Sequence, residues 1–92
     1  MRVRIKVNEQ DAKPHVVVFK QDSLNALFRE AGAKLGFRVS RAFLDSESYP
    51  APEIRSVDEI SNNDLIICTA GEDCWKNEVG TKEELIRVVR VR

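Results

Sequence analysis

Few side chains in this sequence could act as nucleophiles or metal ligands, and they are widely spaced. The 92 residues include two cysteines, Cys68 and Cys74, and a single histidine, His15. A serine or cysteine nucleophile needs a base beside it, and His15 stands at the start of an expected strand, where a histidine is typically solvated or packed. Zinc needs about four ligands at suitable spacing, which these residues do not supply. We therefore expect no catalytic residue, no metal, no cofactor and no enzymatic activity.

The glycines and the acidic residues give equally little sign of catalysis. The four glycines are isolated and form no phosphate-binding loop. The acids gather between Asp45 and Asp64, in segments expected to be loops, whereas a catalytic carboxylate pair needs a cleft that so small a domain rarely provides. We expect no small-molecule substrate.

The charges are balanced in number but separated along the chain. Net charge is zero, yet residues 1–41 carry nine bases and four acids, residues 42–78 two bases and nine acids, and residues 79–92 four bases and two acids. Such a chain can present two opposite charged surfaces. The basic surface is expected from Arg2, Arg4, Lys6 and Lys20, and the acidic surface from Asp45, Glu47, Asp58, Glu59 and Asp64.

These charges allow two interpretations. If the two surfaces face away from each other, copies of the chain can associate through unlike patches, in chains or rings. Alternatively, the charges pair within one molecule or face water, and the basic stripe protects a strand from aggregation. Nucleic-acid binding is not expected, because a global positive charge and aromatic residues on the stripe are lacking.

Two further residues lie in or near the last expected strand. Trp75 either packs over the end of the core or anchors a protein partner through an exposed indole. Cys68 falls inside an apolar strand, where a cysteine behaves as a small buried hydrophobe.

The elements that must position these residues follow from periodicity and turn signals. Arg2 to Val7 alternates polar and apolar residues, which predicts a half-buried strand, and a β-branched second strand at 15–20 predicts an antiparallel hairpin. Apolar residues at helical spacing predict a helix over 24–35, capped by Asp22 or Ser23 and ended by Gly36.

The second half of the chain is expected to complete the sheet. We predict a third strand at 37–44, a proline-containing loop, and a short strand near Ile54. Ser56 to Glu59 has the spacing of a capping box and predicts one helical turn with Val57 and Ile60 inward. A turn at 62–64 then leads into a strand at 65–69, apolar on both faces as in the centre of a sheet.

This order predicts an α+β fold of the ubiquitin-like β-grasp type, with a mixed sheet of four to five strands packed on one main helix. The domain should span residues 1–78, and residues 79–92 should form an extension, either a short helix or a linker, although the alternation at 89–92 also suits a strand. The predicted core is Leu24, Leu27, Phe28, Leu35, Ile5, Val17 and Ile66.

Three segments, VRIKVN, VVVFKQDSLNALFREAGAKLG and VDEISNNDLIICTAGED, resemble the doublecortin-type ubiquitin fold. They are also similar to the KHA-type domain at the C-terminus of plant potassium channels, and the charge separation is similar to that of Phox/Bem-type domains. The resemblance covers roughly residues 2–75. It implies a non-catalytic protein-interaction module of a larger cytoskeletal or scaffold protein, whose partner is another protein or a second copy. The alternative it implies is direct binding to tubulin in microtubules.

The location expected from the sequence is cytoplasmic, with association with the cytoskeleton if the resemblance holds. No apolar run approaches the ~20 residues of a membrane helix, so membrane insertion is not expected. Met1 leads directly into a charged strand rather than into the apolar core of a signal peptide, which favours a cytosolic or nuclear protein.

Overall fold

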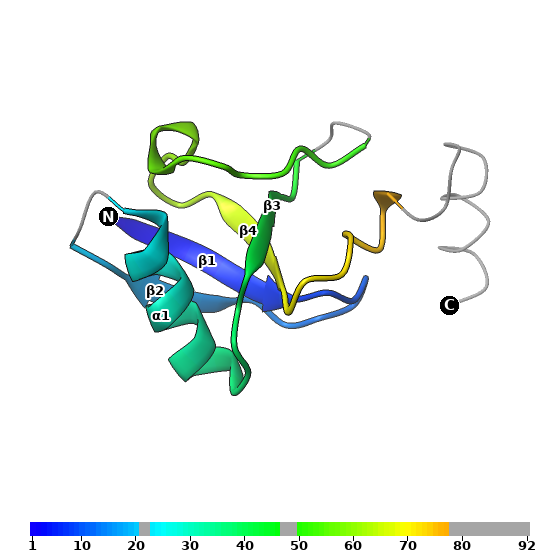
Figure 1. Cartoon of the computed structure of the whole chain (residues 1–92), viewed down its shortest axis with the longest axis horizontal. Coiled ribbons are helices and arrows are strands. Elements are labelled where there is room, and N and C mark those ends of the chain that lie inside the picture. The colour runs from blue at the N-terminus through cyan, green and yellow to red at the C-terminus, as the bar shows by residue number, and fades with distance from the viewer. Residues whose placement is uncertain (21–22, 47–49, 78–92) are drawn as a thin grey trace.

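The chain begins with a β-hairpin. The structure, a computed structural model, describes residues 1–20, 23–46 and 50–77 (Figure 1). Strands β1 (Arg2–Val7) and β2 (His15–Val18) pair antiparallel, as predicted. The alternation in β1 buries Val3 and Ile5, while Arg2 and Arg4 are exposed on the opposite face. Strand β2 ends at Val18 rather than at residue 20, although Phe19 still exchanges hydrogen bonds with Met1.

The helix α1 (Leu24–Leu35) has the bounds that the sequence predicts. Of the two expected caps, Ser23 is the observed one, and its Oγ accepts a hydrogen bond of 3.1 Å from the Ala26 N–H. Gly36 ends the helix in the left-handed conformation, with φ of 86°, which glycine adopts without strain. The helix packs on β1 and β2 and covers one face of the sheet (Figure 1).

The third strand is shorter than predicted. Strand β3 covers Arg41–Leu44, so the prediction is wrong for residues 37–40. These residues run against α1 instead: a Cβ on Gly32 would lie only 2.8 Å from the Phe37 carbonyl oxygen. Pairing with the sheet starts where the Ser40 N–H donates to the Thr69 carbonyl, 2.9 Å away.

The sheet has the strand order β2-β1-β4-β3. Strand β4 (Leu65–Thr69) lies parallel to β1 and antiparallel to β3, so the apolar strand is central, as predicted. The expected short strand near Ile54 is a single bridge between Phe43 and Glu53. The described part of the chain therefore forms a four-stranded mixed sheet packed on one helix, which confirms an α+β fold of ubiquitin-like topology.

The connection between β3 and β4 contains the predicted short helical turn. The 3-10 helix η1 (Val57–Glu59) begins at Ser56, and Ser56 and Glu59 form the capping box that their spacing predicts. Ile60 is buried and Val57 packs against the core, as expected. Asn63 takes a φ of 72° in the turn before β4.

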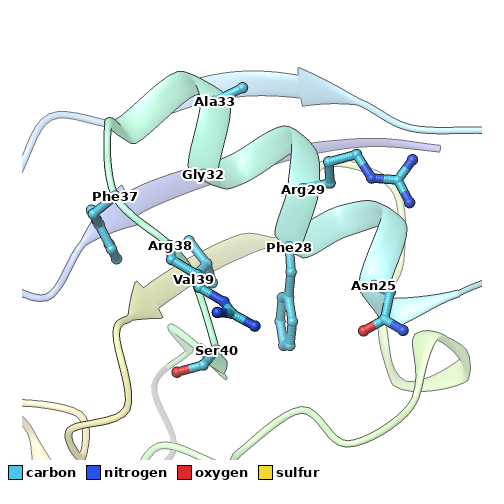
Figure 2. A pocket seen from close by; sticks show the side chains of 9 residues that line it. All are labelled: Asn25, Phe28, Arg29, Gly32, Ala33, Phe37, Arg38, Val39 and Ser40. Atoms are coloured by element: carbon cyan, nitrogen blue, oxygen red, sulfur yellow. The ribbon is translucent and has the colours of Figure 1, made fainter.

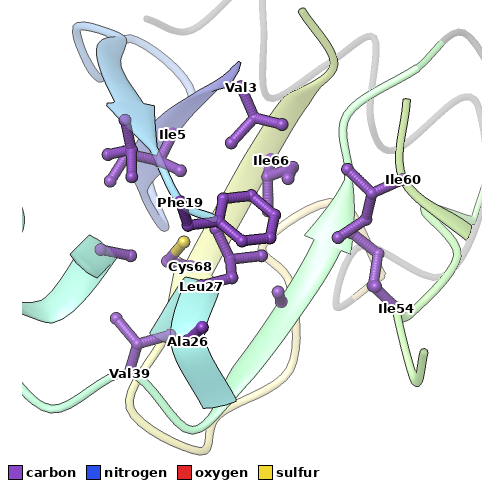
Figure 3. Packing of buried hydrophobic residues seen from close by; sticks show 13 residues of the cluster. Val3, Ile5, Phe19, Ala26, Leu27, Val39, Ile54, Ile60, Ile66 and Cys68 are labelled. Carbon is purple, nitrogen blue, oxygen red and sulfur yellow. The ribbon is translucent and has the colours of Figure 1, made fainter. Parts of the chain in front are cut away.

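The main core lies between the sheet and α1, where side chains from the strands and the helix converge (Figure 3). Of the predicted core residues, four are buried: Ile5, Val17, Leu27 and Ile66. The other three pack against this cluster but remain partly exposed: Leu24, Phe28 and Leu35. The expectation for residues 79–92 lies outside the described residues.

Candidate functional site

The sheet face opposite α1 is divided into a covered and an uncovered half. The strand register places side chains in rows across this face. One row runs from Lys6 through Ile67 to Phe43, and a neighbouring row runs from Val16 to Arg4. Because the chain returns over the first row only, the two halves have different surroundings.

The covered half is a second, small hydrophobic cluster. Phe43 and Ile67 are buried there under Ala51 and Cys74, and Trp75 packs against them. Two asparagine amides hold the covering segment by its backbone. Asn8 accepts from the Trp75 N–H at 2.8 Å, and Asn77 accepts from the Ala51 N–H at 2.8 Å.

Lys6, Asp45 and Lys76 form an ion cluster within this covered half. The Asp45 carboxylate binds Lys6 Nζ at 3.1 Å and Lys76 Nζ at 2.6 Å, and all three side chains are at most 14% exposed. Burial alone would raise the pKa of Asp45, but the hydrogen bonds from Lys76 and Lys6 hold this pKa below its ordinary value. Lys6 therefore does not share the exposure of Arg2 and Arg4, with which the sequence grouped it.

A second ion pair, between Arg41 and Glu53, lies beside Phe43 in the covered half. Arg41 donates to both carboxylate oxygens of Glu53, at 2.8 and 3.2 Å, and to the Gly71 carbonyl at 3.0 Å. Its guanidinium lies 5.0 Å from the centre of the Phe43 ring. The hydrogen bond from Arg41 is the main cause that lowers the pKa of Glu53.

The uncovered half of the face combines valines with arginines. Val16 is 43% exposed and Val18 is 58% exposed; together with Met1 they are the exposed large hydrophobic residues of the described chain. Val18 lies opposite Arg2 and Val16 opposite Arg4. We call these four residues the basic–valine patch: Arg2, Arg4, Val16 and Val18. Arg4 Nε donates to the Asn63 carbonyl at 3.1 Å, in the turn that leads into β4, on the side of β1 away from β2.

The predicted acidic residues have different partners in the described chain. Asp45 is bound by the two lysines. Glu59 accepts the backbone N–H groups of Arg55 and Ser56, both at 2.9 Å, and Asp64 accepts that of Ser61 at 2.8 Å. Asp58 is exposed on η1, and Glu47 lies outside the described residues.

The remaining predicted contact residues differ in their surroundings. Lys20 is exposed just beyond β2. Trp75 is partly buried, so of its two expected roles the structure shows packing on the covered half. Its indole Nε1 is buried and has no hydrogen-bond partner among residues 1–20, 23–46 and 50–77.

Both cysteines are buried free thiols. Burial raises the pKa of Cys68 to about 12 and also raises the pKa of Cys74. Both cysteines therefore stay in the thiol form rather than the reactive thiolate form near neutral pH. Within the described segments, no group of three metal-ligating side chains comes together, and no helix has the length and hydrophobicity that crossing a bilayer requires.

A groove of about 500 Å³ lies between α1 and the segment that follows it (Figure 2). Arg29, Arg38, Asn25 and Ser40 supply its polar groups, and the Phe28 side chain points into it from the helix. These groups suit anion binding and stacking rather than proton transfer near neutral pH. The groove is the second surface to which a ligand could bind.

The sequence interpretation missed the valines of the patch and the Asn8 and Asn77 contacts. Val16, Val17, Val18 and Phe19 form an apolar run, although a strand with one buried face needs an apolar residue only at every second position. The additional apolar residues in this run could have indicated that Val16 and Val18 are exposed. The asparagine contacts join residues 67 and 26 positions apart, which no local pattern reveals.

Comparison with known proteins identifies no relative of this chain. No family model matches the chain, and neither the curated proteins nor the solved structures contain a match. The four-stranded mixed sheet on one helix is consistent with a β-grasp-like fold.

Proposed function

We propose that this domain is a non-catalytic protein-interaction module and that it binds its partner through the basic–valine patch. The observation that carries the proposal is the division of one sheet face into two halves. The chain buries Phe43 and Ile67 under its own residues, but leaves Val16 and Val18 uncovered on the same face.

The chemistry of the patch suits a protein surface. Burying an exposed valine stabilises a complex by about 25 cal/mol for each Å² of apolar area removed from water. Arginine is enriched in protein interfaces, because its guanidinium forms paired hydrogen bonds with carboxylates. Arg2 and Arg4 beside two valines therefore favour a partner surface that mixes apolar and acidic side chains.

The resemblance to doublecortin-type and KHA-type domains suggests a place for the module in a larger cytoskeletal or scaffold protein. Tubulin, whose surface is acidic, is one partner of the required chemistry. Lys6 contributes little to such a contact, because it is buried and bound to Asp45. Self-association through opposite charged faces has weaker support, because Lys6 and Asp45, which were expected on opposite faces, bind each other within the molecule.

Selection from a library of displayed random peptides tests the proposal. The wild-type chain should enrich peptides that bind it, and Val16→Thr with Val18→Thr should weaken their binding at least tenfold. Threonine keeps the shape and the strand propensity of valine, so the fold should be retained. Arg2→Ser with Arg4→Ser should also weaken binding, whereas Arg38→Ser with Arg55→Ser removes the same charge away from the patch and should not.

Cosedimentation with microtubules provides the tubulin arm of the test. Salt-sensitive pelleting that is lost with Arg2→Ser and Arg4→Ser would identify tubulin as the partner. The proposal fails if neither experiment yields a partner whose binding depends on the patch.

A further inference from the structure

The outer edge of β2 has unpaired backbone groups. Met1 and Phe19 exchange hydrogen bonds across the hairpin, the Met1 N–H to the Phe19 carbonyl and the Phe19 N–H to the Met1 carbonyl. In an antiparallel ladder such pairs alternate, so Val17 and His15 also bond to β1. The N–H and C=O groups of Val16 and Val18 therefore point away from β1.

The opposite edge of the sheet is already occupied. The Ile54 N–H donates to the Ala42 carbonyl at 2.8 Å, and the Leu44 N–H donates to the Pro52 carbonyl at 2.9 Å. In the described chain β2 pairs with β1 alone, which makes its outer edge the open one. An open edge with exposed valines is a template for another strand.

A groove beside β2 can receive alternate side chains of such a strand. It has a volume of about 240 Å³ and lies between β2 and the helix residues Glu30, Ala33 and Lys34. Side chains of an added strand would alternate between this groove and the open face beside Val16 and Val18. The small Ala33 side chain leaves room for branched aliphatic side chains in the groove.

The charges around this edge select an acidic occupant. Five bases surround it: Arg2 and Arg4 on the neighbouring strand, Lys34 on α1, and Lys13 and Lys20 near the ends of β2. Glu30 is the acid that lines the groove. Within the described segments, none of these five bases forms an ion pair.

We propose that the outer edge of β2 binds an extended peptide segment, rich in β-branched residues and flanked by acids, as an additional strand. The order of the extended sheet would then be peptide-β2-β1-β4-β3. Main-chain hydrogen bonds to Val16 and Val18 supply affinity, the β2–α1 groove selects aliphatic side chains, and the bases select flanking carboxylates. This inference rests on the proposed function and specifies its partner.

A second copy of the chain suits this edge less well. Pairing of β2 with β2 of another copy would be isologous, so each copy would bring the same surface to the contact. The five bases of both copies would then be brought together and would repel each other. An acidic segment has no such repulsion, which is why we assign the edge to a different partner.

Fluorescence anisotropy with synthetic peptides tests the inference on the full chain. The probe has four alternating valines and isoleucines between pairs of aspartates. One control replaces the aspartates with lysines. A second control carries N-methyl groups on alternate amides, which cannot donate to a neighbouring strand. A third control carries the N-methyl groups on the other alternate amides, because the register in which the peptide pairs with β2 is not known in advance. We expect the lysine peptide and one of the two methylated peptides to bind at least tenfold more weakly than the probe.

Variants of the protein test the same contact from the other side. Val18→Pro removes an outward N–H and no hydrogen bond to β1, so the strand should survive while probe binding falls at least tenfold. Val18→Thr retains that N–H and should weaken binding less. In amide hydrogen exchange, Val16 and Val18 should exchange rapidly in the free chain and become protected by the probe.

Three results would overturn the inference: no binding of the acidic probe, equal binding of the probe and both methylated peptides, or unchanged exchange at Val16 and Val18. The peptide comparison does not depend on how well any variant folds. If library-selected peptides bind the patch while the acidic probe does not bind, the strand-addition inference is wrong and the proposed function stands. If neither binds, and microtubule pelleting does not depend on the patch either, both fail. Concentration-dependent dimerisation through β2 would assign the edge to a second copy and also contradict the inference.

Discussion

Removal of the Asp45 carboxylate should destabilise the domain strongly, because Asp45 forms a buried ion cluster with Lys6 and Lys76. In Asp45→Asn, Lys6 and Lys76 would remain close together with no negative charge between them. Their side chains are 8% and 14% exposed, so water can replace the carboxylate only in part. Removing one partner of a buried ion pair lowers the free energy of unfolding by about 3–5 kcal/mol, whereas an exposed ion pair contributes about 0–1 kcal/mol to it.

We expect Asp45→Asn to lose about 3 kcal/mol of unfolding free energy, the low end of the buried range, because the cluster retains some exposure. For a domain of this size each kcal/mol lowers the melting temperature by roughly 4–8 °C, so the midpoint should fall by about 12–24 °C. Urea denaturation followed by circular dichroism measures the free energy directly. The exposed Asp58→Asn is the matched control and should change it by less than about 0.5 kcal/mol.

The pH dependence of the same variant checks the physical reason. The pKa of Asp45 is lowered in the folded chain, so its contribution is present above the ordinary unfolded value of about 3.9 and is lost as the pH falls through the folded pKa. The stability difference between wild type and Asp45→Asn should therefore shrink in acid. A difference below 1 kcal/mol at pH 7, or one that does not shrink on acidification, would refute this reasoning.

Three further predictions concern the core. Leu27→Ala should cost about 2–5 kcal/mol of unfolding free energy and Phe28→Ala less, because Leu27 is fully buried and Phe28 is not; chemical denaturation measures both, and equal losses would contradict the burial pattern. Gly32→Ala should destabilise the domain despite the better helix propensity of alanine, since the new Cβ would meet the Phe37 carbonyl at 2.8 Å; a raised melting temperature would show that this segment can move. Cys68 should resist a thiol reagent until the chain is unfolded in urea, because burial raises its pKa to about 12; rapid labelling of the native chain would contradict this.

Local patterns were sufficient to predict the order of the elements and several of their bounds. Alternation predicted β1, helical spacing and Gly36 predicted α1, and the spacing of Ser56 and Glu59 predicted the capping box. These features depend on neighbours within a few residues, so they are readable from the sequence. The start of β3 was not, because the close approach of the Phe37 carbonyl to Gly32 depends on how the chain leaves the helix.

The site was less predictable, because it depends on contacts between distant residues. Arg4 and Lys6 are two positions apart on the same strand face, and the sequence treated them alike. Arg4 is exposed in the structure. Lys6 is enclosed by Asp45 and by the covering segment, which carries Lys76. Which half of a sheet face is covered is decided by long-range packing, and alternation along one strand contains no information about it.

The most direct test of the interaction surface is a two-dimensional NMR titration of the ¹⁵N-labelled chain with a peptide from the library selection. If the basic–valine patch is the binding surface, the largest shift changes should fall on the amides of β1 and β2, with Val16 and Val18 among them. Shift changes confined to the groove between α1 and residues 37–40 would contradict this assignment and place the binding site on the other side of the sheet.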